Sequence, residues 1–262
     1  YGVAATVRGA GGQVDFSLQN TLPAVAVTVS GTGSGSVASA PAGIACGATC
    51  TASFGYNTQV TLAATPDTGS TFTGWSGACS GNGACAVTMT ANKAVTATFT
   101  RNQYMAAASA DPAAGGTVSG GGMVSHGDTV TVVATANSGY TFAHWTEEGK
   151  AVSTDASYSF TATGDRALVA HFTRNQYTIA ASADPAAGGT VSGGGTVNYG
   201  DEVTLTATAN AGYTFINWTE GGTQVSTDVS YSFLAAGSRA LVAHFTRNQY
   251  TVAASADPAA GG

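Results

Sequence analysis

The chain has 262 residues, of which 8% are charged and 44% hydrophobic, and its formal net charge is −6. Six arginines and two lysines are scattered along the sequence, so no basic patch favours nucleic acid as a partner. No apolar run approaches the roughly 18 residues of a membrane-spanning helix, so we expect no membrane insertion within this segment.

The first residues resemble the end of a domain that precedes the main body of the chain. Residues 3–20, VAATVRGAGGQVDFSLQN, predict two strands joined by a glycine-rich turn. We expect 1–24 to be the last hairpin of a preceding domain. Alternatively, these are orphan strands that pair with neighbouring subunits in a fibre. Because the chain starts at Tyr1 with no signal peptide, we expect a segment of a longer processed protein.

Most of the sequence is an internal repeat, which decides the architecture. Segments 101–173 and 174–246 align without a gap and differ at 18 of 73 positions. Residues 247–262 begin a further copy, and 25–100 are a diverged relative that shares the T-F-x-x-W motif and the final strand. The motif Arg-Asn-Gln-Tyr marks the same point three times, at 101–104, 174–177 and 247–250.

Each copy is predicted to consist of strands. Alternation is clearest in VTLTATA (203–209), which places Val203, Leu205 and Ala207 on one face and threonines on the other. A single short helix within 219–230 is an alternative for that stretch. The strands predicted in the third repeat are 178–183, 189–192, 196–199, 202–209, 213–219, 230–234 and 239–245.

Aromatic residues are predicted to form the core of a very small domain rather than an exposed binding platform. On a regular strand, Tyr213 and Phe215 share a face, and Trp218 points the other way unless the chain bends. The later strands add Tyr231, Phe233 and Phe245.

The junction between copies, LVAHFTRNQYTIAASADP, contains no Gly, Ser or Pro linker before Asp184. The last strand of one copy therefore runs almost directly into the first strand of the next. We expect an all-β fold of tandem small β-sandwich or β-grasp-like repeats that form a stiff, elongated rod.

The pattern DPAAGGTVSGGG, followed by YGDEVTLTATANAGYTF and RALVAHF, resembles the divergent internalin-type B-repeat, a repeat domain of bacterial surface proteins. Residues 26–100 resemble a cysteine-containing branch of that group, through PAGIACGATC and GWSGACSGNGAC. The resemblance implies small extracellular β units. Such units occur in adhesins, in surface-layer and fibre proteins, and as accessory parts of secreted enzymes. The resemblance supplies no catalytic residues.

All four cysteines, Cys46, Cys50, Cys79 and Cys85, lie in the first repeat. An even number in an extracellular type of domain indicates two disulfides, with three connectivities open. We favour Cys46–Cys50 and Cys79–Cys85, each closing a turn. A four-cysteine zinc site is the alternative, although spacings C-x3-C and C-x5-C differ from the usual knuckle. Disulfides would place the chain in an oxidising compartment.

Three histidines in the second repeat, His126, His144 and His171, suggest a metal site. The next copy keeps only the last of them, as His244, so we favour histidines without a ligand role. The sequence has no D-x-D-x-D-G calcium loop, no G-x-S-x-G elbow and no phosphate loop. We therefore expect no catalytic residue, no metal and no cofactor.

These patterns predict a structural stalk, spacer or fibre-forming segment of a secreted or cell-surface bacterial protein. The expected partners are neighbouring copies of itself in a fibre, or other domains of the surface protein. An adhesin or carbohydrate-binding module is the alternative, with glycans bound by an exposed strand face such as TVTVVAT (129–135). A further alternative is an accessory region of a secreted hydrolase.

Overall fold

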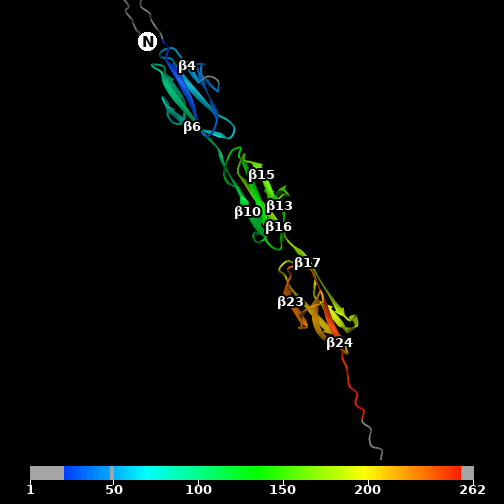
Figure 1. Cartoon of the computed structure of the whole chain (residues 1–262). Helices are drawn as coiled ribbons and strands as arrows, with labels where there is room; N and C mark the ends of the chain where they lie inside the picture. Colours follow the sequence, from blue (N-terminus) through cyan, green and yellow to red (C-terminus); the bar gives the residue numbers. More distant parts are fainter. Residues whose placement is uncertain (1–20, 48–49, 255–262) are drawn as a thin grey trace, which may run out of the picture. The chain divides into compact units, whose positions relative to one another are not determined.

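The structure is a computed structural model that describes residues 21–47 and 50–254, and this part of the chain is built from β-strands (Figure 1). Two short 3₁₀ turns, η1 (Ala113–Gly115) and η2 (Ala186–Gly188), are its only helical elements. The all-β prediction is confirmed. The stretch 219–230 holds strands instead of the alternative helix, and the hairpin predicted in 3–20 lies outside the described residues.

The first repeat is a sandwich of two four-stranded sheets, with strand orders β4-β1-β8-β6 and β3-β2-β5-β7. β1 and β8 are parallel neighbours. Val25 and Phe99 from the first sheet share one buried cluster with Val60 and Leu62 from the second, so the core lies between the sheets. The strands are β1 Ala24–Gly31, β2 Gly35–Ala40, β3 Ala45–Cys46, β4 Thr51–Ser53, β5 Gln59–Pro66, β6 Ser70–Gly77, β7 Cys85–Thr88 and β8 Lys93–Arg101.

The second and third repeats each have a five-stranded and a three-stranded sheet. The orders are β11-β9-β16-β13-β14 with β10-β12-β15, and β19-β17-β24-β21-β22 with β18-β20-β23. The second repeat has β9 Gln103–Asp111, β10 Gly116–Gly120, β11 Gly122–Ser125, β12 Thr129–Ala136, β13 Tyr140–Glu147, β14 Lys150–Ser153, β15 Ser157–Thr161 and β16 Arg166–Arg174. The third has β17 Gln176–Asp184, β18 Gly189–Ser192, β19 Gly195–Asn198, β20 Glu202–Ala209, β21 Tyr213–Glu220, β22 Thr223–Ser226, β23 Ser230–Leu234 and β24 Arg239–Arg247.

A β-bulge decides where the tryptophan of each repeat points. In β21 the pairing register with β24 shifts between Phe215 and Asn217. Because one extra residue reverses the alternation of faces, Trp218 turns into the core beside Phe215, with ring centroids 5.9 Å apart. The same shift precedes Trp145 in β13 and Trp75 in β6. The chain thus bends, and the regular-strand expectation that Phe215 and Trp218 lie on opposite faces does not apply.

By its contacts, the chain divides into two compact units, and the border between them passes through the second repeat. The junction between the first and second repeats lies inside one unit, and the junction between the second and third lies inside the other.

Candidate functional site

The candidate site is the junction between successive repeats, where the loop that joins β11 to β12 meets the preceding repeat. This loop, 126–128, turns at Gly127, whose φ is +82°. Asp128 is held by the strand end before the loop, because its Oδ2 accepts a hydrogen bond of 3.1 Å from the amide of Ser125, the last residue of β11. The loop that joins β19 to β20 has the same form, with Tyr199 in place of His126. We call 126–128 and 199–201 the ring–Gly–Asp loops.

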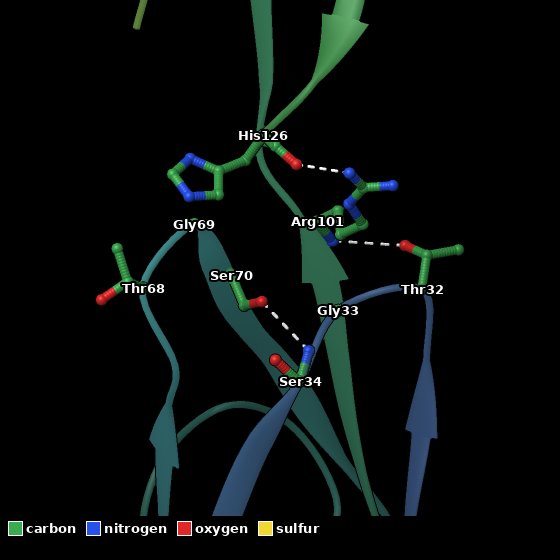
Figure 2. A pocket seen from close by; sticks show the side chains of 8 residues that line it. All are labelled: Thr32, Gly33, Ser34, Thr68, Gly69, Ser70, Arg101 and His126. Atoms are coloured by element: carbon green, nitrogen blue, oxygen red, sulfur yellow. Dashed lines mark hydrogen bonds between the residues drawn. The ribbon is translucent and has the colours of Figure 1, made fainter. Parts of the chain in front are cut away.

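An ion pair joins each ring–Gly–Asp loop to the strand end that precedes it. Arg101, the last residue of β8, places Nη2 2.7 Å from Oδ1 of Asp128. The same guanidinium donates to the carbonyl oxygen of His126, as Figure 2 shows. Arg174, the last residue of β16, repeats this arrangement with Asp201 at 2.7 Å. These side chains are well exposed, so water weakens the attraction and the pair contributes mainly orientation.

An aromatic ring covers a glycine at each junction. Gly69 and Gly139 lie in turns of the preceding repeat and have φ of +77° and +78°. A Cβ atom on Gly69 would lie 1.9 Å from Cδ2 of His126, and one on Gly139 would lie 1.9 Å from Cδ1 of Tyr199. Only glycine leaves room for the ring and adopts this backbone without strain.

One asparagine connects the backbones of both repeats. The Asn102 amide donates to the Gly69 carbonyl at 2.8 Å, and the Asn102 carbonyl accepts from the His126 amide at 2.8 Å. The Thr71 hydroxyl donates to the Asn102 side chain at 2.7 Å, which holds the asparagine in place. Asn175 makes the same three bonds at the second junction. We call the Arg–Asp pair, the ring over the glycine and this asparagine bridge together a joint between the two repeats.

A pocket of about 260 Å³ opens beside the first junction (Figure 2). The hydroxyl groups of Ser70 and Thr32 accept hydrogen bonds from the Ser34 and Arg101 amides, so they brace the turns around the pocket. At the second junction, η1 occupies the place of the short turn 32–34. There the hydroxyl groups of Ser138 and Tyr199 lie 3.3 Å apart, which adds a side-chain hydrogen bond across the junction. The pocket is lined by Thr32, Gly33, Ser34, Thr68, Gly69, Ser70, Arg101 and His126.

The joint carboxylates should respond to acid. The hydrogen bond from Arg101 lowers the pKa of Asp128 below its ordinary value of 3.8. The pKa of Asp201 is lowered first by the Asn198 amide and then by Arg174. A lowered folded-state pKa means that the stabilisation is complete above pH 3.8 and is lost as pH falls through the lower value. We expect carboxyl-carbon NMR titrations of both residues to have midpoints below 3.8. Midpoints at or above 3.8 would contradict the pairs, and Asp128→Asn and Asp201→Asn supply the assignment controls.

The four predicted cysteines form two disulfides, Cys46–Cys50 and Cys79–Cys85, with Cα atoms 4.6 and 5.5 Å apart. Cys85 is fully buried, and Cys79 packs against the same core. All four cysteine sulfurs lie in disulfides, so none of them is a free thiolate for the alternative zinc site.

The structure separates the predicted histidines. His126 lies at the junction, whereas His144 and His171 stack with ring centroids 5.0 Å apart. His171 Nδ1 lies 3.2 Å from Oδ2 of Asp111, and Nε2 lies 2.9 Å from the Thr146 hydroxyl. Within 21–47 and 50–254, no three His, Cys, Asp or Glu side chains gather as a potential metal site.

This Asp–His–Thr chain has the order of a hydrolase triad. The Thr146 side chain is buried, however, so its hydroxyl is closed to a substrate. The three hydrogen-bonded side chains instead connect strands β9, β13 and β16. The third repeat has the same network in His244, Asp184 and Thr219.

Sequence reasoning missed the joint. Its signal was present, because Arg101 precedes Asp128 by 27 residues and Arg174 precedes Asp201 by the same interval. The first repeat has Thr58 at the corresponding position.

The fold and its junctions define a tandem β-sandwich repeat protein in which specific contacts join successive repeats. The family described as the divergent InlB B-repeat domain matches residues 25–103, 106–176 and 177–249. The chain belongs to this family and contains three tandem B-repeat domains of the bacterial surface-protein type, which confirms the family prediction.

Curated proteins and solved structures were compared with the chain as well. No curated protein matches the sequence. Among solved structures, the Bacillus anthracis TIE protein is similar, with a TM-score of 0.49 and 10% identity. The alignment covers 87% of this chain and 51% of that one, so the chain spans about half of its length. Within the described residues, no helix has the length and apolar character needed to cross a membrane.

Proposed function

We propose that this chain is a non-catalytic stalk or spacer of a secreted or cell-surface bacterial protein. The observation that carries the proposal is that one joint recurs at both junctions. Each joint combines an Arg–Asp pair, a ring over a glycine and an asparagine bridge. Family membership and the two disulfides support an extracellular place. In this role, 25–100, 101–173 and 174–246 are the structural units, and the partners are flanking domains of the same protein.

Each joint restricts the rotation of one repeat against the next. A single peptide link between two domains allows a wide range of orientations. At each junction, the Arg–Asp pair, the ring over the glycine and the asparagine bridge add three contacts to that link, and each one limits its rotation. Stability in such arrays depends on nearest neighbours, so a joint repeated along the chain would stiffen the whole array. Stiffness is what a spacer needs, since it sets the distance between the parts it separates.

Spin labels on the full chain test this proposal. Thr154 and Thr227 are exposed and equivalent in the second and third repeats, so Thr154→Cys and Thr227→Cys place one label on each side of the second joint. We expect one narrow distance distribution by pulsed electron paramagnetic resonance. Gly139→Ala should broaden it, because the new Cβ would displace the Tyr199 ring.

Gly212→Ala is the matched control. Gly212 has φ of +83°, so alanine is strained there to a similar degree, but a Cβ at that position meets nothing within 4 Å. The distribution should therefore stay narrow. A broad distribution in the unsubstituted chain would mean flexible beads and would contradict a stalk. Specific binding in a glycan screen would favour the adhesin alternative instead.

A further inference from the structure

The third repeat carries the first half of another joint. The Asn248 amide donates to the Gly212 carbonyl at 2.8 Å, as Asn102 does to Gly69 and Asn175 to Gly139. The Thr214 hydroxyl holds the Asn248 side chain at 2.6 Å. Arg247 ends β24, as Arg101 ends β8. We call Gly212, Arg247 and Asn248 the acceptor face.

This acceptor face is already arranged, although no ring covers it in the described part of the chain. A Cβ on Gly212 would meet nothing within 4 Å, whereas Gly69 and Gly139 each lie against a ring. Arg247 is exposed. Tyr250, the equivalent of half-buried Tyr104, is 79% exposed. The asparagine contacts therefore form within the third repeat and leave a preformed surface.

We propose that the acceptor face binds the ring–Gly–Asp loop of a further repeat in the same chain. The loop's aromatic ring would cover Gly212, its amide would donate to the Asn248 carbonyl, and its carboxylate would pair with Arg247. This inference rests on the proposed function, because it extends the joint that carries it. Two filled joints of identical design support the choice of occupant, and the Arg247 cation matches the carboxylate.

The aspartate carboxylate of the loop decides which loops the acceptor face binds. In the first repeat, 56–58 read Tyr-Asn-Thr, so Thr58 replaces the aspartate. In the sequence before that repeat, FSLQN aligns with FTRNQ and places Leu18 where Arg101 stands. Arginine and aspartate are thus present together or absent together. A loop of the first-repeat type would leave Arg247 without its partner, so the acceptor face selects loops of the second and third type.

The test extends the chain after Gly262 with a copy of 190–246, which completes the repeat begun at 247. A Cβ on Gly139 would lie against the Tyr199 ring, so the α-proton that takes the place of this Cβ in glycine faces the ring. The ring current should shift the NMR signal of this α-proton upfield. Gly212 should lack this shift in the present chain. In the extended chain, Gly212 should gain an upfield shift similar to that of Gly139.

Two variants define the contacts. Arg247→Ala in the extended chain should reduce the Gly212 shift, and so should an extension that carries threonine at the position copied from Asp201. A second extension, copied from 117–173 and carrying the His126 loop, repeats the test with a different sequence. It keeps the inference testable if the first extension does not fold.

The outcomes are distinguishable. An unshifted Gly212 beside a shifted Gly139 in a folded extension would overturn the inference and leave the stalk proposal standing. If Gly139 is unshifted as well, the joint is wrong and both proposals fail. A Gly212 shift that grows with concentration in the unextended chain would identify a second copy as the occupant and also overturn the inference.

Discussion

Reduction of both disulfides should lower the free energy of unfolding of the first repeat by about 4 kcal/mol, and the other two repeats should keep theirs. The bonded cysteines are 4 and 6 residues apart. Loop-closure entropy for rings of this size gives about 2 kcal/mol for each bond. Both bonds pack into the first core, which is separate from the cluster of the third repeat. The loss should therefore stay local.

The three tryptophans make this measurable, because each repeat has one: Trp75, Trp145 and Trp218. Their indole NMR signals can be followed during urea unfolding of the full chain, with and without reductant. The Trp75 transition should move to lower urea, and the other two should not. Equal movement of all three would show that stability is shared along the array. Cys79→Ala with Cys85→Ala separates the contribution of one bond from that of the other.

Trp218→Ala should cost the third repeat about 3–5 kcal/mol, as is usual when a large aromatic side chain is removed from a core. Trp218 is 0% exposed and lies beside Phe215. Its indole Nε1 donates to the carbonyl oxygen of Asp228 at 3.1 Å. The substitution therefore leaves both a cavity and a carbonyl without its donor, and it is expected to unfold this repeat first.

Ile216→Ala is the matched control for this substitution. Ile216 lies two residues earlier on β21 and is 47% exposed, so its truncation should change the stability by no more than about 0.5 kcal/mol. Urea unfolding of the full chain, followed by circular dichroism and by the remaining indole signals, measures both variants. A loss below about 1 kcal/mol for Trp218→Ala would contradict its place in the core.

Strands with strong alternation were predictable in detail. β18, β20 and β23 coincide with the predicted 189–192, 202–209 and 230–234. β22 (Thr223–Ser226) was missed, because TQVS follows two glycines, is short and lacks a clear apolar face. Its formation depends on pairing with β21, which local sequence does not report.

An interaction within the third repeat, in which one arginine stacks on an aromatic ring and pairs with a glutamate, was also not predicted from the sequence. Arg239 lies over the Phe233 ring at 4.2 Å, and its Nη2 is 2.6 Å from Oε2 of Glu220. The hydrogen bond from Arg239 lowers the pKa of Glu220, and the same bond raises the pKa of Arg239. Arg166 repeats the stacking in the second repeat, on Phe160 at 4.1 Å. The first repeat has Lys93 at the start of the equivalent strand, and there Cys79–Cys85 crosslinks the loop after the tryptophan strand.

The amino-acid sequence by itself determined the β class, the 73-residue repeat and the family, because alternation and self-similarity are properties of neighbouring residues. Only the tertiary structure decided that a bulge turns Trp218 inward and that His126 and Tyr199 cover glycines of the preceding repeat. Those outcomes depend on how segments far apart in the chain meet. Contact between such segments depends on sheet register and on packing across the whole fold, and the alternation within one strand does not report which distant segment it meets.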